Sequence, residues 1–461
     1  MNQLFNPVFV SKLLKSYFFD INRLWDISEE ELLELRNMRF KKILNFAFSV
    51  PLYHEIYKKA GLSADDINNL DDIKKLPIIS KKEIKKFYPD GLISKKVKKN
   101  KLIKVSTSGT TGQSLSIFVD LNDVIMGLFG YIRMLREYNI HWRKDRITII
   151  GDFAPHTVES GYINRGIFAK MQNSFLFNNI QWLDTNKKPE ELINEIDKFN
   201  PDFLGGYVGM LGHLALLKEK GLGKNINPKV IGTTGSVVDE TLRKYICDVF
   251  STNYLFETYG STEAGPIAFE CRNQSYHILS DLVHIEIIED KKELPFNKAG
   301  HVIITKLYGI GTPIIRYSAM NDIASLSNKN CSCGMSGYLL KKVYGRDILS
   351  LYLPDGKVLL PSSITQIFSK ILYELKTNKV IDLQVIQHSF KYLEVRLVID
   401  KKLKNKAPTI LQIKNIIKRG FIEKMGKDIK LNIVEVNKIN RDDSRIISRV
   451  EREKIKINGY I

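Results

Sequence analysis

The chain has 461 residues, of which 44% are hydrophobic and 26% are charged, and its formal net charge is +19. This length exceeds one ordinary hydrophobic core, and the composition is that of a globular protein, so we expect two or three folded domains. No apolar run is long enough for a membrane-spanning helix, and we expect neither a secretory signal nor a membrane span. By default these features indicate a cytoplasmic protein.

Two helix starts can be predicted near the beginning of the chain. Ser28 is followed three residues later by Glu31, and Ser80 is followed by Glu83, which are capping-box patterns. We therefore expect a long helix after Ser28, ended by Pro51, and a second helix after Ser80.

A polar loop at 106–112 follows the predicted strand 101–105 and precedes the predicted strand 115–119. Its hydroxyls could donate to phosphate oxygens, and its glycines would let backbone N–H groups approach an anion. Only two residues separate the glycines, and Gln113 stands where a Walker loop has lysine, so this is not a Walker P-loop. The alternative is a turn without a ligand. The hydroxyl residues and glycines are Ser106, Thr107, Ser108, Gly109, Thr110, Thr111 and Gly112.

Strand-like and helix-like segments alternate between residues 101 and 345, which predicts an α/β fold with a largely parallel sheet. The strands expected there are 146–150, 203–207, 229–233 and 253–257, followed by a β-rich part with strands 283–288 and 300–305. Beyond residue 347 the order changes to αββαβ, with helices 361–376 and 408–425 and strands 380–387, 392–399 and 429–436. We predict a large domain over 1–346 and a small, mobile α+β domain over 347–461.

The cysteines and one histidine predict a metal site. Cys331 and Cys333 form a tight pair in a polar loop, and Cys271 precedes His277 in another loop-like stretch. Three thiolates and one imidazole would complete a tetrahedral structural zinc site. The alternative is a set of unrelated thiols. Cys247 lies in a helix-like stretch and is expected in the core.

Three further segments suit a nucleotide. In residues 257–263 a tyrosine beside a glycine could stack on a purine, and Glu263 could hold Mg²⁺, which prefers oxygen ligands. Asp322 could bind ribose hydroxyls, and Arg346 could meet phosphate or ribose oxygens. Each segment alone is also compatible with an ordinary cap or a surface salt bridge.

Taken in order, residues 107–112, 259–263, 322 and 346 resemble the adenylate-forming superfamily. Residues 50–53 and 76–81, together with the scattered cysteines, are similar to phenylacetate–CoA ligases and CapK-type capsular-polysaccharide proteins. The resemblance implies that ATP and a small organic acid give an acyl-adenylate, whose acyl group passes to a thiol, amine or hydroxyl; coenzyme A is one candidate. It also strengthens the zinc prediction.

The resemblance implies a role for each site residue. The phosphate contacts fall on Ser108, Gly109, Thr110, Thr111 and Gly112. The purine and ribose contacts fall on Gly235, Ser236, Tyr259, Gly260, Asp322 and Arg346. The residues at the α-phosphate and Mg²⁺ are Thr262 and Glu263.

The sequence departs from the family at one position that bears on turnover. Arg445 stands where the family carries a catalytic lysine, and its planar guanidinium is not equivalent to an ammonium. Two hypotheses remain open: an AMP-forming acid ligase, and a protein that binds nucleotide or acyl-adenylate with little turnover. The net charge of +19 raises a third, nucleic-acid binding. No recognisable motif for nucleic acid accompanies that charge, so we expect no such partner.

Overall fold

The computed structural model describes residues 11, 17–107, 115–153, 157, 160, 178–318, 320–439, 446–450 and 459–460. Among these residues, no helix combines the length and the apolarity that a bilayer crossing requires. The predicted phosphate-loop residues and the predicted catalytic arginine lie outside the described residues; they are Ser108, Gly109, Thr110, Thr111, Gly112 and Arg445.

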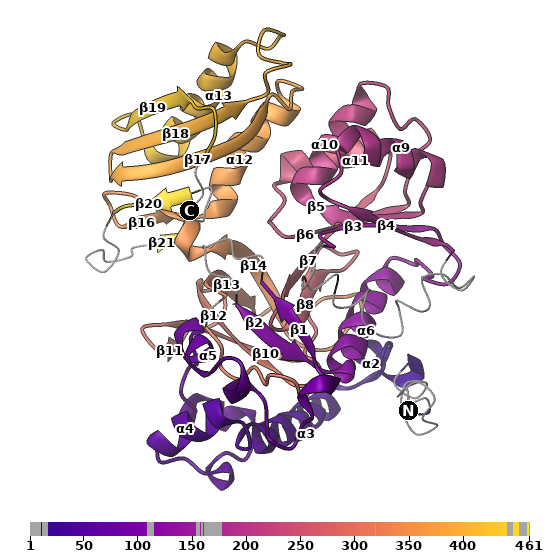
Figure 1. Cartoon of the computed structure of the whole chain (residues 1–461), viewed down its shortest axis with the longest axis vertical. Helices are drawn as coiled ribbons and strands as arrows, with labels where there is room; N and C mark the ends of the chain where they lie inside the picture. Colours follow the sequence, from indigo (N-terminus) through magenta and orange to yellow (C-terminus); the bar gives the residue numbers. More distant parts are fainter. Residues whose placement is uncertain are drawn as a thin grey trace.

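Helices form the N-terminal part of the molecule (Figure 1). Ser28 caps α3 and Ser80 caps α5, each with the predicted capping box. Pro51 does not simply end the first helix. It takes the first position of α4, where its missing N–H removes no hydrogen bond. The helices of this part are α2 (Arg23–Asp26), α3 (Glu29–Ala47), α4 (Pro51–Lys59) and α5 (Lys81–Phe87), with a 3₁₀ turn η3 (Leu70–Lys75) between the last two.

A continuous ladder of twelve strands forms the centre of the described chain. One end is parallel and follows the predicted α/β alternation, with helices packed beside the sheet (Figure 1). Its strands are β4 (Ile180–Asp184), β3 (Ile147–Gly151), β5 (Phe203–Tyr207), β6 (Val230–Thr234) and the first half of β7 (Tyr254–Ser261). The helices beside it are α9 (Pro189–Phe199), α10 (Val208–Glu219) and α11 (Glu240–Phe250), whereas α6 (Leu121–Glu137) packs against the antiparallel part of the sheet.

The other end of the ladder is antiparallel. β7 is the junction, because residues 254–257 pair in parallel with β6 and residues 258–261 pair antiparallel with β8. The antiparallel strands, in spatial order from β7, are β8 (Gly265–Glu270), β9 (Tyr276–Ile278), β14 (Leu339–Arg346), β13 (Asp322–Ser327), β12 (Gly300–Lys306), β10 (Val283–Glu289) and β11 (Lys292–Glu293).

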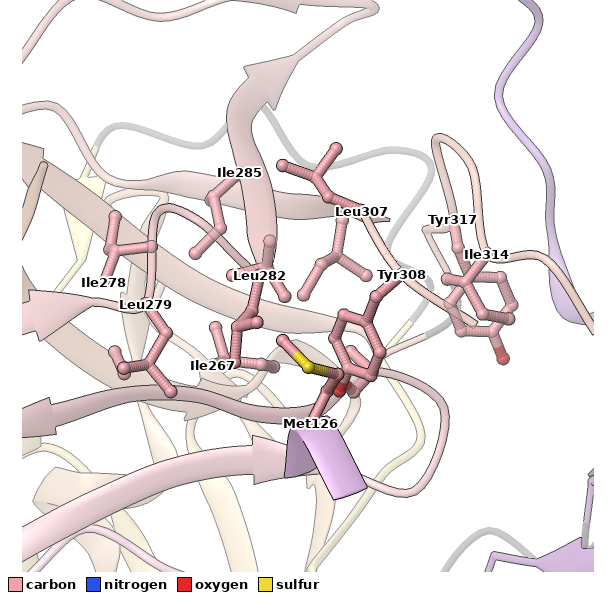
Figure 2. Packing of buried hydrophobic residues seen from close by; sticks show 14 of the residues in the cluster. Met126, Ile267, Ile278, Leu279, Leu282, Ile285, Leu307, Tyr308, Ile314 and Tyr317 are labelled. Atoms are coloured by element: carbon pink, nitrogen blue, oxygen red, sulfur yellow. The ribbon is translucent and has the colours of Figure 1, made fainter. Parts of the chain in front are cut away.

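The largest core lies against this antiparallel part. Figure 2 shows Ile267, Ile278 and Ile285 from three strands gathered on the same side as Met126 of α6. Tyr308, just after β12, lies next to Met126 in the same view, and its hydroxyl donates to the carbonyl of Ala264 at 3.0 Å. The core thus fixes the turn that follows β7.

A short hairpin precedes the sheet. β1 (Ile103–Ser106) and β2 (Ser116–Val119) pair antiparallel, which agrees with the strand–loop–strand arrangement expected around the polar loop. The hairpin is tied to the segment after β12, because the backbone N–H of Thr312 donates to the carbonyl of Phe118 at 2.7 Å.

The C-terminal part has its own core and contains the predicted αββαβ elements. Ser369 of α12 donates to Asp239, the N-cap of α11, at 2.6 Å, and Lys376 pairs with Glu219 at 2.9 Å. The predicted α/β class with a small α+β C-terminal unit is confirmed; the boundary at 346/347 and the mobility stay predictions. The elements are α12 (Pro361–Tyr373), β17 (Val380–Ser389), β18 (Tyr392–Ile399), α13 (Ile410–Met425), β19 (Lys430–Glu435) and β20 (Ile446–Ser448), with the short strands β15 (Leu351–Tyr352), β16 (Lys357–Leu359) and β21 (Gly459–Tyr460).

Candidate nucleotide site and metal centre

The predicted purine motif lies where the sheet changes from parallel to antiparallel. Tyr259 and Gly260 are in the last half of β7, and Thr262 and Glu263 form the tight turn into β8. The motif therefore ends a strand and does not cap a helix, which was the alternative. A Cβ at Gly260 would lie 2.9 Å from the carbonyl oxygen of Gly265, so the close strand crossing requires glycine.

Asp322 lies directly beside this motif. The hydroxyl of Tyr259 donates to Asp322 Oδ2 at 2.8 Å, and Asp322 is the cross-strand partner of Arg346 in the β13–β14 pair. Burial raises the pKa of Asp322 to about 6, although Arg346 and the tyrosine hydrogen bond oppose the rise, and Glu263 adds to it. The structure thus brings together four residues that the sequence analysis had taken from three separate motifs.

The Tyr259 ring is largely enclosed, with 9% of the residue exposed. Its pKa is raised by burial first and by Asp322 second, so the phenol stays a neutral donor. No contact among the described residues tests the predicted stacking of the Tyr259 ring on adenine.

Glu263 has a buried partner that the sequence analysis missed. The hydroxyl of Tyr317, a residue that is 1% exposed, donates to Glu263 Oε1 at 3.0 Å. The neighbouring Arg316 has φ +46° and pairs with Glu286 at 2.6 Å, which holds the backbone before Tyr317 in an unusual conformation. Tyr317 lies five residues before the predicted ribose ligand Asp322, and this proximity was the available signal in the sequence.

Lys81 is a second residue that sequence reasoning did not assign. It opens α5, directly after the capping Ser80. Burial lowers its pKa, as do Lys85 and Arg346, whereas the charge of Glu263 raises it. The lysine is therefore electrostatically close to the cluster, and it adds a cation beside Glu263.

Gly235 and Ser236 follow β6, next to the purine motif. The hydroxyl of Thr234 donates to the carbonyl of Thr258 at 3.3 Å, which aligns the ends of β6 and β7. Gly235 has φ +84°, and a Cβ there would lie 2.6 Å from the Tyr207 ring. Both predicted residues are exposed at this edge, and nothing in their contacts assigns them to a ligand.

The two ends of the polar loop are held together. Ser106 and Ser116 hydroxyls lie 2.8 Å apart, and Thr107 exchanges two hydrogen bonds with the backbone of Leu115, at 2.8 and 2.9 Å. The described residues thus fix where the loop starts and returns, which is on the β1–β2 hairpin.

The four predicted zinc ligands converge. The donor atoms of Cys271, His277, Cys331 and Cys333 all lie within 4.8 Å of one another. The Cys271 and Cys331 sulfurs are 3.6 Å apart, and Cys333 Sγ is 3.1 Å from His277 Nε2. Zn–S bonds of about 2.3 Å at tetrahedral angles place two sulfurs about 3.8 Å apart, so the donor set fits a zinc ion.

One expectation about this cluster is wrong. His277 is not in a loop; it lies in β9, paired with Phe269 of β8 and Leu339 of β14. Burial lowers the pKa of His277 to about 4, so its imidazole is neutral, the form that binds metal. Cys247 packs from α11 against a separate hydrophobic cluster, as expected.

Comparison with known proteins identifies relatives of the chain. CapK from Staphylococcus aureus is 25% identical over 429 residues, covering 92% of this chain and 90% of CapK. A phenylacetate-coenzyme A ligase from Thermus thermophilus is 23% identical over 342 residues, covering 69% and 71% of the two chains. Residues 351–450 also match the family described as CapK C-terminal domain. The chain is homologous to CapK and to the phenylacetate–coenzyme A ligases.

The fold of this CapK homologue agrees with that relationship. A 2-hydroxyisobutyryl-CoA ligase in the postadenylation state aligns with a TM-score of 0.71 at 16% identity, covering 92% of this chain and 90% of the ligase. The architecture of the chain is therefore that of an adenylate-forming ligase, as the motifs predicted. Homology and fold together indicate an AMP-forming acid–CoA ligase.

Proposed function

We propose that the chain is an ATP-dependent carboxylate-activating ligase. The observation that carries the proposal is the cluster at the β7 junction, where Tyr259 bonds to Asp322 and Tyr317 bonds to Glu263. The motifs assign the nucleotide and its metal to Tyr259, Asp322 and Glu263, which come from segments far apart in the sequence.

The proposed reaction joins a carboxylate oxygen to the α-phosphorus of ATP and breaks the bond to pyrophosphate. The acyl-adenylate then passes its acyl group to a nucleophile and releases AMP. Both reactants are anions, so Lys81 and Arg346 would offset their repulsion near the α-phosphate. Asp322 would accept hydrogen bonds from the ribose hydroxyls, and Thr262 would lie near the α-phosphate. Mg²⁺, held by Glu263, would supply further charge neutralisation on the triphosphate.

We assign the cysteine–histidine cluster to a structural zinc ion. Four protein ligands would leave no open position for chemistry, so the ion would serve stability. His277 stands between β8 and β14, the strands that lead to the purine motif and to Arg346. The ion would therefore hold the loop at 331–333 against the strands next to the proposed nucleotide site.

The test is pyrophosphate release with a panel of organic acids, with hydroxylamine present to trap activated acyl groups as hydroxamates. We expect one class of acid to give a hydroxamate. Glu263→Gln should lower kcat/KM for Mg·ATP in pyrophosphate release by about ten-fold or more. Loss of one hydrogen-bonded contact to a transition state has an effect of at least that size. Failure of every acid to give a trapped product would count against the ligase.

A second candidate function follows from Arg445, which stands at the position of the catalytic lysine. In this alternative the chain binds nucleotide or acyl-adenylate with little turnover. Calorimetry that detects ATP binding, with no pyrophosphate released for any acid, would select it. Restoring the family's residue with Arg445→Lys should then produce turnover.

The biological setting is also part of the proposal. Homology to CapK suggests surface-polysaccharide assembly, with coenzyme A, an amine or a sugar hydroxyl as acceptor, and the free thiols suit the cytoplasm. Assays of acyl transfer to each acceptor class after acid activation would distinguish among them.

A further inference from the structure

A buried arginine lies between two cavities on the N-terminal side of the antiparallel sheet. Arg36 of α3 is 4% exposed, and it lines both cavities together with Tyr338. Each cavity has a volume of about 330 Å³, which suits a small molecule. One cavity lies between α3, η3 and β10, away from the Tyr259 cluster, none of whose residues lines it.

Within the described chain, the guanidinium of Arg36 has no carboxylate in direct contact. Among the described residues, no carboxylate oxygen lies within 4.0 Å of its guanidinium. Its Nη2 is 2.8 Å from Nδ1 of His284, its guanidinium lies 5.0 Å above the Tyr338 ring, and its Nε has no hydrogen-bond partner. Burial lowers the pKa of Arg36, although Tyr338 and the more distant charges of Glu29 and Asp281 oppose the shift. An anion that contacted the guanidinium directly would stabilise its charge further.

The carboxylates nearby are engaged elsewhere. Glu286 lines the cavity but pairs with Arg316 at 2.6 Å, and Glu29 accepts from the backbone N–H of Gly337 at 2.7 Å. Burial lowers the pKa of His284 to about 3, so its ring is neutral and accepts from Arg36 through Nδ1. The ring proton is then on Nε2, and His284 adds a donor and no negative charge.

The remaining walls combine apolar side chains with one further cation and two exposed carboxylates. Lys74 of η3 lines the cavity with an exposed side chain, while Asp71 and Glu293 are also exposed at this opening. The apolar lining comes from Leu70, Ile73, Ile285, Phe296 and Leu326. A ligand with one anionic end and an apolar body would satisfy both kinds of wall.

We propose that this cavity binds a small organic carboxylate, with its carboxylate on Arg36 and its apolar body against Ile73, Ile285 and Leu326. The guanidinium presents paired donors in a planar fork that matches a carboxylate. The site does not depend on the proposed ligase activity, because it shares no residue with the nucleotide cluster.

The test is isothermal titration of the full chain with benzoate, acetate and inorganic phosphate. We expect benzoate to bind at one site, and more tightly than acetate or phosphate, because only benzoate fills the apolar part. Arg36→Met keeps the length of the side chain and its helix propensity, and should lower benzoate affinity by about ten-fold or more, the worth of a charged hydrogen-bonded contact. Lys74→Glu, at an exposed position, should lower it several-fold.

The matched control is Lys75→Glu, which makes the same charge change one residue along η3 but does not line the cavity. It should leave benzoate affinity within about two-fold, because Lys75 does not line the cavity and its ammonium pairs with Asp72 at 2.7 Å. Equal benzoate binding by the natural chain and Arg36→Met would place the ligand elsewhere, including in the proposed acid site, and overturn the proposal. So would the absence of saturable benzoate binding, or phosphate binding as tight as benzoate. A failed ligase assay would leave each of these results unchanged.

Discussion

At the scale of single residues, one hydrogen bond holds the carboxylate proposed to bind Mg²⁺. The Tyr317 hydroxyl donates to Glu263 Oε1 at 3.0 Å, and both residues are buried, so the carboxylate has little freedom to turn. Tyr317→Phe removes only the hydroxyl. We expect the Mg²⁺ concentration for half-maximal pyrophosphate release to rise several-fold, with a small change in the KM for the acid. Tyr308→Phe, which loses a hydroxyl bonded to the Ala264 carbonyl, is the matched control.

The raised pKa of Asp322 gives a second prediction at this scale. Burial raises the pKa to about 6, and only the ionised carboxylate can accept from both ribose hydroxyls. The ionised fraction rises about ten-fold between pH 5 and pH 7 for a pKa of 6, so adenosine affinity should rise with pH by a similar factor. Adenosine is the suitable probe because it has no phosphate to titrate in this range. Asp322→Asn should bind adenosine weakly and independently of pH; a persisting pH dependence in that variant would remove Asp322 as its source.

At the scale of elements, the cysteine–histidine cluster proposed to bind zinc joins β8 and β9 to the loop at 331–333. Because His277 is paired on both sides within the sheet, it is the rigid member of the set. Cys333→Ser should reduce bound zinc from about one ion per chain to well below that, and lower the melting temperature by several degrees. Cys247→Ser, which changes a cysteine outside the cluster, should leave zinc content unchanged. Elemental analysis and thermal unfolding measure both; equal zinc content in the two variants would contradict the assignment.

The turn after β6 gives a prediction of stability. Gly235 has φ +84° and a Cβ there would lie 2.6 Å from Tyr207, so Gly235→Ala should reduce the free energy of unfolding by about 1–3 kcal/mol. Gly209→Ala is the control, since a Cβ at that position in α10 meets nothing within 4 Å. It should be neutral or slightly stabilising. Urea unfolding of both variants measures the difference. An unchanged free energy of unfolding for Gly235→Ala would mean that the backbone relaxes at this position.

At the scale of the whole molecule, α12 of the C-terminal part lies beside the α10–α11 layer (Figure 1), and two polar contacts there can be removed by substitution. Ser369 bonds to Asp239, and Lys376 pairs with Glu219 at an exposed site, which is worth less than a buried pair. The double variant Ser369→Ala, Lys376→Ala should increase the radius of gyration measured by small-angle scattering, with little loss of overall stability. Lys370→Ala breaks an ion pair with Glu423 within the C-terminal part, and should leave the radius unchanged.

The sequence by itself determined the local elements and the motifs. The capping boxes at Ser28 and Ser80, the strand β18 and the hairpin around the polar loop depend on neighbouring residues, and such short-range patterns can be read along the chain. The four zinc candidates were also readable, because few residue types bind zinc and the chain has only four cysteines.

Only the tertiary structure decided which distant side chains meet. Four features depend on strand order and on burial. They are the change from parallel to antiparallel pairing inside β7, the place of His277 in a strand, the bond from Tyr317 to Glu263, and the buried Arg36 between two cavities. Strand order and burial leave no regular pattern of residues along the sequence. Contacts between segments far apart in the chain are selected by packing of the complete core.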